Sequence, residues 1–438
     1  MKKKSKHTFV RVDPTEIVEA LVGLKAVRVL EYRRDGHRVE LLVEQSDPVM
    51  FCPACGSAAV VKERPIVSYV DLPVYGQPMR LVWRKHRLKC PAVECSQNSW
   101  TNGDHRIAAA RCLLTTRCAK WATMQVGNGR TVRDVARELG CDWHTVNDAV
   151  LIYGQALLAA DRKRLNTTTA IGLDETSFVK HGHQRTRNYV TTVADVANHQ
   201  IIDVLPTRSF VDVAAWLDVQ PKAWKDRIEY GALDMSPTYS AVYRVILPQA
   251  RQVVDAFHCV QLANRALDQV RRRVQQQQTG HRGRRDDPLY RIRRVLLTGE
   301  EKLDQARQER LQTLLELGDP GGEVAIAYRV KERLREFYRA PDIDAGQRLL
   351  NELISACQRD SMPPEIRKLG RTLHNWSERI CNYHHAKISN GPTEALNNLI
   401  KRIKRIGFGF RNFTNYRIRV LLYAGKPNWR TLNSIIVR

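Results

Sequence analysis

Two closely spaced cysteine pairs place the strongest constraint on how this chain can fold. Cys52 and Cys55 form the first pair, and Cys90 and Cys95 form the second, with a gap of four residues instead of two. The sequence between the pairs has strand-like alternation around a Gly76-Gln77 turn. Zinc binds four soft ligands tetrahedrally, and each pair supplies two of them. The spacing predicts a structural zinc ribbon, with four buried structural thiols as the alternative.

The charge balance indicates the class of partner. The 438 residues include 71 Lys and Arg against 46 Asp and Glu, a net charge of +25, which favours a polyanion, most often nucleic acid. No uncharged apolar run reaches the ~18 residues of a membrane span. The basic start, residues 1–7, precedes no apolar segment, so we expect no secretory signal. We therefore expect a cytoplasmic protein without membrane partners, whose cysteines do not form a disulfide framework.

A helix-turn-helix pattern occupies residues 131–146, with the sequence TVRDVARELGCDWHTV. Ala136 is small enough to pack against a second helix, Gly140 permits the turn, and Val146 would anchor the second helix in the core. Such a helix can enter the major groove of DNA. An ordinary helical hairpin is the alternative interpretation. The candidate DNA-binding residues at the start of the second helix are Trp143, His144 and Asn147.

The middle of the chain changes from an α/β pattern to an all-helical one. The predicted strands, of which the first three form a meander, are Ala170–Asp174, Asn188–Asp195, Gln200–Leu205, Ile228–Asp234 and Gln252–Asp255. Residues 262–388 have almost no strand signal and indicate helices. Within them, residues 275–287 are poor in apolar side chains and rich in Gln, Gly and Arg, which predicts an exposed loop.

Three carboxylates stand out by their placement. Asp174 ends the first predicted strand, Asp234 ends the fourth, and Glu394 lies in the first turn of the last strongly amphipathic helix. Carboxylate oxygens are preferred ligands of Mg²⁺, and two such ions can drive an in-line displacement at phosphorus. Strand-end aspartates commonly cap loops, however, and Asp255 and Glu175 compete for the same roles. Spacing alone therefore leaves the assignment open.

Two basic stretches are candidate contacts for DNA phosphates. Residues 395–419 contain seven basic side chains, no acidic one, and four interleaved aromatic rings. Cations pair with phosphates and an unstacked base can lie on a ring, although at least two of the four rings are expected to close the core. Residues 265–294 hold ten Arg against three Asp and predict a second such surface. The candidate DNA-binding residues of the first stretch are Lys401, Arg402, Lys404, Arg405 and Arg411.

These blocks, taken in order, resemble the ISL-three family of bacterial insertion-sequence transposases, which use a DDE catalytic triad. After the cysteine pairs and the helix-turn-helix come IGLDE at 171–175, LDMSPTY at 233–239, VDAFH at 254–258 and SNGPTEALNNLIK at 389–401. The resemblance implies a ribonuclease-H-like core with its triad at Asp174, Asp234 and Glu394. It places Asp255 and His258 near the site but outside the triad.

The resulting fold class is multidomain α+β, with a zinc ribbon, a helix-turn-helix, and a ribonuclease-H-like α/β core interrupted by a large all-helical insertion. The expected segments are 1–104 for the N-terminal strands and zinc ribbon, 105–165 for the helix-turn-helix domain, 166–261 for the first part of the core, 262–388 for the insertion, and 389–438 for the C-terminal helices of the core.

The expected function is that of a DNA transposase. The zinc ribbon and helix-turn-helix would recognise the terminal inverted repeats of the element. With two Mg²⁺ ions, or Mn²⁺ in their place, water would cleave the element end, and the freed 3′-hydroxyl would attack double-stranded target DNA. Because two ends must be handled together, we expect a dimer or larger assembly, associated with the bacterial nucleoid when bound. The alternatives are a non-catalytic zinc and helix-turn-helix regulator, and a structure-specific nuclease on the same fold.

Overall fold

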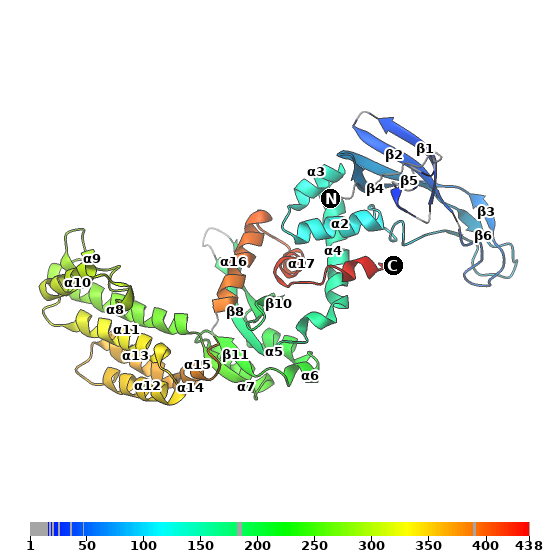
Figure 1. The fold of residues 1–438 in the computed structure, drawn as a ribbon. Helices are drawn as coiled ribbons and strands as arrows, with labels where there is room; N and C mark the ends of the chain where they lie inside the picture. The colour runs from blue at the N-terminus through cyan, green and yellow to red at the C-terminus, as the bar shows by residue number, and fades with distance from the viewer. Residues whose placement is uncertain are drawn as a thin grey trace, which may run out of the picture. The chain divides into compact units, whose positions relative to one another are not determined.

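The computed structural model describes residues 16, 19, 22–24, 27–35, 37–46, 48–181, 186–388 and 391–437 (Figure 1). Of the sequence features above, residues 1–7, Ser389 and Asn390 lie outside this description. The chain forms two compact units, one made of Met1–Arg164 with Arg402–Arg438 and the other of Leu165–Lys401. Within the described ranges, no helix has the length and apolar character needed to cross a membrane.

The first unit begins with a four-stranded sheet of order β1-β2-β5-β4. Its strands are β1 (Val27–Asp35), β2 (Arg38–Gln45), β4 (Ile66–Val74) and β5 (Gln77–Arg84). β4 pairs with β5 in an antiparallel hairpin, as the Gly76-Gln77 turn predicts. β1 also pairs antiparallel with β2, and the parallel pairing of β2 with β5 joins the two pairs. Met79, Leu81 and Trp83 alternate into the core of this sheet, since successive strand residues point to opposite faces.

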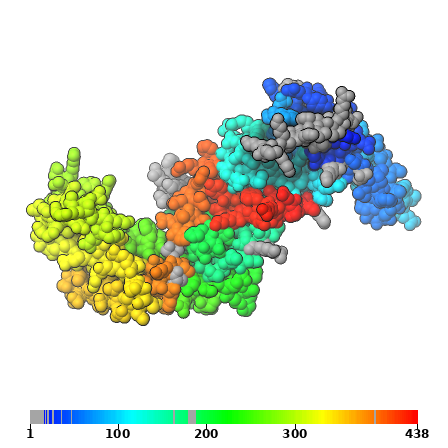
Figure 2. All heavy atoms as spheres, in the orientation of Figure 1, coloured from blue at the N-terminus to red at the C-terminus, as the bar shows by residue number. Residues whose placement is uncertain are grey.

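A helical group completes the first unit. Its helices are α2 (Thr116–Gly127), α3 (Val132–Leu139), α4 (Trp143–Ala160), α17 (Phe413–Ala424) and α18 (Thr431–Ser434). α17 packs against α2 and α4, so the two ends of the chain share one core. Figure 2 shows the red surface of the C-terminal residues lying against the cyan surface of these helices. The stretch 389–438, which was expected to belong wholly to the catalytic core, is thus divided between the units at residue 401.

The predicted helix-turn-helix is confirmed in its detail. Ala136 and Val146 are buried in the core shared by α3 and α4. Gly140 ends α3 with φ +63°, a left-handed conformation that a glycine adopts without a Cβ penalty. Side-chain caps by Thr131 and Asp142 then begin α3 and α4. Local signals therefore mark the start of both helices and the turn between them.

A second, three-stranded sheet carries the cysteine loops. Its strands are β3 (Val60–Glu63), β6 (Arg87–Lys89) and β7 (Ser99–Thr101), in the order β3-β6-β7. Both pairings are antiparallel. One cysteine pair precedes β3, and the other lies in the connection from β6 to β7. The sheet brings the two connections together at one end, which is the arrangement that a zinc ribbon requires.

The second unit is built on a five-stranded mixed sheet of order β10-β9-β8-β11-β12. Its strands are β8 (Ala170–His181), β9 (Thr186–Asp195), β10 (Gln200–Leu205), β11 (Tyr230–Leu233) and β12 (Arg251–Val254). β8, β9 and β10 form the predicted antiparallel meander, while β11 runs parallel to both β8 and β12. A buried cluster joins this sheet to α5 (Phe210–Asp218) and α7 (Pro237–Ile246), and the short α6 (Lys222–Lys225) lies between them in the chain.

Helices fill the rest of the second unit. They are α8 (Ala256–Thr279), α9 (Pro288–Arg291), α10 (Gln305–Gly318), α11 (Glu323–Arg339), α12 (Ile343–Cys357), α13 (Pro364–Asn375), α14 (Ser377–Cys381) and α15 (Tyr383–Ala386). They enclose a large apolar core of their own. The last long helix, α16 (Gly391–Ile406), returns to the sheet. The predicted all-helical character of residues 262–388 is therefore observed in the described residues.

Replacing Gly140 with alanine should destabilise the first unit. An added Cβ would lie 2.9 Å from the Cβ of Pro78, on top of the left-handed conformation. We expect Gly140→Ala to lower the free energy of unfolding by about 2–3 kcal/mol, measured by urea unfolding. Gly76→Ala is the matched control, because Gly76 has φ +77° and a Cβ added there would meet nothing within 4 Å. The control should lose about 1 kcal/mol, and equal losses would contradict the close packing.

Candidate catalytic cavity, metal centre and DNA-binding residues

Register in the second unit brings two of the predicted carboxylates together. β8 and β11 are parallel, with Leu173 opposite Leu233. Asp174 follows Leu173 and Asp234 follows Leu233, so the two carboxylates lie at the same level of the sheet. Both line a cavity of about 500 Å³, and Glu394, in the first turn of α16, lines the same cavity. The three residues predicted from separate parts of the sequence therefore share one site.

Asn397 fixes the orientation of Asp174. Its amide Nδ2 donates to Asp174 Oδ2, and the backbone N–H of Glu175 donates to Asp174 Oδ1 over 2.7 Å. The amide oxygen of Asn397 accepts from the hydroxyls of Thr176 at 2.8 Å and Thr192 at 3.2 Å. Asn397 is buried, and its two hydroxyl donors come from β8 and β9. These bonds tie α16 to the sheet at the level of the cavity.

The electrostatics of the cavity favour a bound cation. Burial and the nearby carboxylate of Asp234 together raise the pKa of Asp174 to about 6. Two carboxylates that line one cavity repel each other, and a divalent cation between them would remove that repulsion. The carboxylate oxygens of Asp174, Asp234 and Glu394 that line the cavity are also ligands of the kind that Mg²⁺ prefers. The residues present thus fit a hard divalent cation.

The imidazole of His258 contacts the carboxylate of Asp234. Its Nδ1 lies 2.8 Å from Asp234 Oδ1 and 2.9 Å from Asp255 Oδ2. Hydrogen bonds to Asp234 and Asp255 raise the pKa of His258 to about 10, so the imidazole is protonated at neutral pH in this arrangement. Asp255 is buried at the start of α8, and the cavity lining includes His258 but not Asp255. Asp255 therefore contacts His258, while Asp234 and His258 face the cavity.

Glu175, the other competitor in the sequence, also lies at the cavity but forms an ion pair there. Its Oε2 pairs with Arg208 at 2.8 Å, and that guanidinium lies 4.8 Å from the centre of the Tyr189 ring. Glu175 lines the cavity together with Tyr189. The sequence predicted no role for Asn397, which lies in the block at 389–401. The available signal was its position, three residues after Glu394 on the same helical face.

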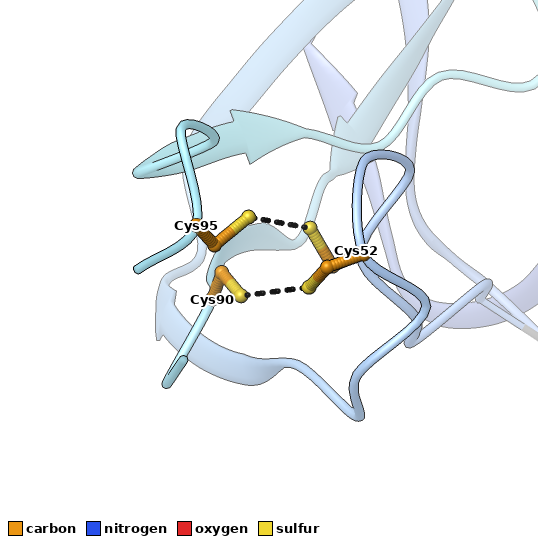
Figure 3. Close-up of side chains that lie close together, drawn as sticks. Cys52, Cys90 and Cys95 are labelled. Atoms are coloured by element: carbon orange, nitrogen blue, oxygen red, sulfur yellow. Dashed lines mark hydrogen bonds between the residues drawn. The ribbon is translucent and has the colours of Figure 1, made fainter. Parts of the chain in front are cut away.

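The four paired cysteines form a compact group in the first unit. All four sulfurs lie within 4.8 Å of one another, and among the described residues no other group of three or more His, Cys, Asp or Glu is as suitable for a metal ion. The Cys52 and Cys95 sulfurs are 3.7 Å apart, and those of Cys55 and Cys90 are 3.5 Å apart. Figure 3 shows the labelled thiols pointing toward one another. Tetrahedral zinc with sulfur ligands separates the sulfurs by about 3.8 Å, so the predicted ribbon site fits zinc.

The three residues predicted to face the DNA groove differ in how exposed they are. The side chain of Trp143 is 42% exposed, and His144 is also exposed at the start of α4. Asn147 is only 6% exposed, contrary to its expected place in the groove. The reason is helical periodicity, because Asn147 follows Val146 on the side of α4 that packs inward. The surface available to DNA at this helix consequently begins with Trp143 and His144.

The basic stretch after Ala395 is mostly exposed. Phe408 is almost fully exposed to solvent, Tyr416 is buried, and the other two aromatic rings of the stretch are half-buried. Of the expected core rings, Tyr416 is thus the one that is fully buried. The exposed cations are Lys401, Arg402, Arg405 and Arg411, and Lys404 is half-buried.

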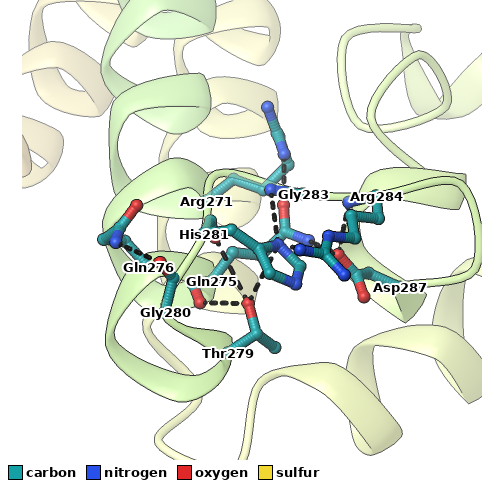
Figure 4. A network of polar contacts seen from close by, with 9 residues as sticks. All are labelled: Arg271, Gln275, Gln276, Thr279, Gly280, His281, Gly283, Arg284 and Asp287. Atoms are coloured by element: carbon teal, nitrogen blue, oxygen red, sulfur yellow. Dashed lines mark hydrogen bonds and ion pairs between the residues drawn. The ribbon is translucent and has the colours of Figure 1, made fainter.

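The arginine-rich stretch 265–294 differs from its prediction. α8 continues to Thr279, and Gln275 is buried, so the expected exposed loop is shorter than predicted. Figure 4 shows Arg271, Gln275 and Asp287 in one polar network, in which Arg271 donates to Gln275 and Gln275 donates to Asp287. Arg273 pairs with two glutamates, at 2.6 and 2.8 Å. Some of these arginines therefore hold the helical part together instead of facing phosphates.

Comparison with known proteins agrees with this arrangement. A family model described as Transposase matches residues 171–420, more than half of the chain. A model for the helix-turn-helix domain of transposase family ISL3 matches residues 104–151. A model for the zinc-finger of transposase IS204/IS1001/IS1096/IS1165 matches residues 48–95. The three matches follow the order of the sheet, helix pair and cavity described above.

Individual relatives point the same way. The chain is 26% identical over 427 residues to the transposase for insertion sequence element IS1001 of Bordetella parapertussis, covering 92% of this chain and 97% of that protein. It is 25% identical over 262 residues to the transposase for insertion sequence element IS1557 of Mycobacterium tuberculosis, covering 55% of this chain and 57% of that protein. The chain therefore belongs to the ISL3 (ISL-three) family of insertion-sequence transposases, with a zinc-finger, a helix-turn-helix and a transposase region in that order.

Proposed function

We propose that this transposase cuts DNA at the ends of its insertion sequence and joins them to target DNA, with Asp174, Asp234 and Glu394 as its DDE triad. The observation that carries the proposal is the shared cavity, to which β8, β11 and α16 each contribute one carboxylate. Two Mg²⁺ ions, or Mn²⁺ in their place, would be held by these three residues. When bound, such ions stabilise charge on the attacking and leaving oxygens of an in-line displacement.

The surrounding residues supply positioning and charge. Asn397 holds one oxygen of Asp174, and His258 holds one oxygen of Asp234, which limits the rotation of both carboxylates. Lys401 also lines the cavity, where its ammonium can pair with a DNA phosphate. Positioning of the DNA strand and neutralisation of its charge then account for catalysis, so no Ser or Tyr nucleophile is required.

The architecture supports a ribonuclease-H-like core. A three-stranded antiparallel meander followed by two parallel strands, with an essential helix returning to the first strand, is the arrangement expected of that fold. We propose that residues 262–388 are an insertion between β12 and α16, since they enclose a separate apolar core. On this proposal the domains 1–104, 105–165, 166–261 and 262–388 are as expected above, while the last expected segment, 389–438, is divided between the two units after Lys401.

DNA recognition is assigned to the first unit and the C-terminal half of α16. We propose that the helix-turn-helix and a zinc-bound ribbon recognise the terminal inverted repeats, with Trp143 and His144 at the DNA surface. The exposed cations Lys401, Arg402, Arg405 and Arg411, with Lys404 beside them, would contact phosphates of the ends or of the target. Because two ends take part in one reaction, the active form is proposed to be a dimer or larger assembly on DNA.

The first test removes one negative charge from the cavity. Asp234→Asn keeps the shape of the side chain but loses the charge that a cation requires, so Mg²⁺-dependent cleavage of labelled element ends should fall by more than about a hundredfold. Binding of the same DNA, measured by anisotropy, should change little. Asp360→Asn, at a fully exposed aspartate, is the matched control and should cleave normally. Parallel loss of binding in Asp234→Asn would count against a catalytic role.

Strand joining separates a transposase from a nuclease. The wild-type protein should convert cleaved ends into products covalently joined to target DNA, and Asp234→Asn should give neither product. Cleavage without joining under all conditions would favour the structure-specific nuclease. Specific binding with neither reaction in the wild type would favour the regulator.

A second test concerns the residue that orients Asp174. Asn397→Ala removes the donor to Asp174 while leaving all three carboxylates in place. We expect the Mg²⁺ concentration for half-maximal cleavage to rise by roughly tenfold, as is typical when a partner of a metal ligand is lost. Asn398→Ala, one residue on at an exposed position, should leave it unchanged. If saturating Mg²⁺ failed to recover any activity in Asn397→Ala, a positioning role would be wrong.

A third test concerns the ribbon. Cys52→Ser should reduce bound zinc from about one ion per chain toward zero, because a tetrahedral site loses a quarter of its ligands. It should weaken binding to element ends more than binding to unrelated DNA. Cys112→Ser, outside the cluster, should keep its zinc. Unchanged zinc content in Cys52→Ser, measured by elemental analysis, would refute the assignment.

A further inference from the structure

A second cavity lies in the first unit, where the start of the helix-turn-helix meets the loop between α16 and α17. Its volume is about 490 Å³, within the range of small-ligand sites. One wall comes from α3 and the start of α4, including Trp143, and the other from residues 406–412 and α17. The cavity belongs entirely to residues of the first unit and is separate from the carboxylate cavity. It therefore takes no part in the chemistry proposed for the three carboxylates.

Arg419 contributes a buried charge to the wall of this cavity. It lines the cavity, although its side chain is only 5% exposed, and neither Nε nor Nη2 has a hydrogen-bond partner. Within the described ranges no carboxylate forms an ion pair with it, and its nearest aromatic ring is Phe410, 5.8 Å from the guanidinium carbon. Burial lowers the pKa of Arg419 to about 10, so the side chain is still charged at pH 7. A buried charge with unmet donors is costly to keep, and an anionic ligand would satisfy it.

Phe408 gives the cavity an exposed ring. Its side chain is 94% exposed, and its backbone has φ +52°, the left-handed region that phenylalanine rarely adopts. The conformation is held by the end of α16, where Phe408 N–H donates to Arg405 and Gly409 N–H donates to Lys404. Strained backbone that displays a large apolar side chain is typical of binding sites. Trp143, which is 42% exposed, offers a second ring on the opposite wall.

The charge around the cavity is positive. Arg133, Arg137 and Arg411 are exposed and line it, against a single carboxylate, Asp134. Asp134 accepts from the hydroxyl of Thr131 at 2.7 Å and also lies 3.5 Å from Arg137. The cavity thus combines a cationic rim, a buried unmet guanidinium and exposed aromatic rings. A nucleotide matches all three features, because it has both a phosphate and a flat base.

We propose that this cavity binds one unpaired nucleotide of a DNA strand, with its base stacked on Phe408 and its phosphate held by Arg411 and Arg419. The inference rests on the proposed DNA-binding function and adds a specific contact to it. A duplex hides its bases within the stack, so the site selects DNA in which a nucleotide is already extruded. It would hold such a nucleotide next to the helix that is proposed to contact the DNA groove.

The test compares three DNA duplexes that are otherwise identical: fully paired, with one bulged thymidine, and with an abasic site in place of that thymidine. Dissociation constants are measured for the full-length protein by fluorescence anisotropy without Mg²⁺. The wild type should bind the bulged duplex about tenfold more tightly than the abasic one, the size expected for stacking one base on a ring. Phe408→Ala and Arg419→Met should each reduce that ratio to about one while paired-duplex binding stays within about twofold.

Controls keep the outcomes distinct. Tyr75→Ala removes another exposed ring at a left-handed position, 88% exposed with φ +48°, and should keep the full preference. Because Phe408 is on the surface, its variant stays informative if Arg419→Met fails to fold. Equal binding of the bulged and abasic duplexes by the wild type would overturn the nucleotide site but not DNA binding. Failure to bind any duplex would instead overturn the proposed function.

Discussion

The parallel pairing of β8 with β11 is the constraint on which the carboxylate cavity depends. It sets Leu173 opposite Leu233, so that the next residues, Asp174 and Asp234, reach the same level. A slip of one residue in either strand would turn its aspartate away, because side chains alternate between the faces of a sheet. The hydroxyl of Tyr243 donates to carbonyls of both strands, at 3.1 and 3.2 Å. This buried side chain therefore holds the register that brings two like charges together.

The third carboxylate reaches the cavity by a different route. The helices α8 to α15 lie between β12 and α16 in the chain, yet α16 docks on β8 and β9 through Asn397 and two threonine hydroxyls. The cost of closing a chain loop grows only slowly with its length, so a long connection is tolerable if it folds on its own core. The helices from α8 to α15 have such a core. The amide of Asn397 holds α16 on the sheet. The position of Glu394 therefore depends on this contact of α16 and not on the length of the chain between β12 and α16.

Sequence predicted those features that local patterns determine. The alternation of strands, the Gly140 turn and the cysteine spacing appear where they were predicted, and Asp234 directly follows β11, but β8 continues to His181, so Asp174 lies within its strand instead of ending it. The sequence did not show which polar residues are buried in the protein interior. Asn147 and Gln275 are buried, because partners and packing distant in sequence determine their environment. The sequence also did not distinguish Asp234 from Asp255, whereas in the structure Asp234 lines the cavity and Asp255 contacts His258 without lining it.

The same limit applies to the excess of positive charge, which indicates a polyanionic partner without showing which cations contact it. Arg273 is surrounded by two glutamates and Arg271 is buried in a polar network, so both are neutralised within the protein. Arg419 is also buried, but two of its donor atoms remain unmet. A cation that folding has removed from water without a partner identifies a binding position more strongly than an exposed one, because exposed arginines are satisfied by solvent. On this reasoning we place the proposed nucleotide contact where the protein leaves a charge uncompensated, and not where its charge is densest.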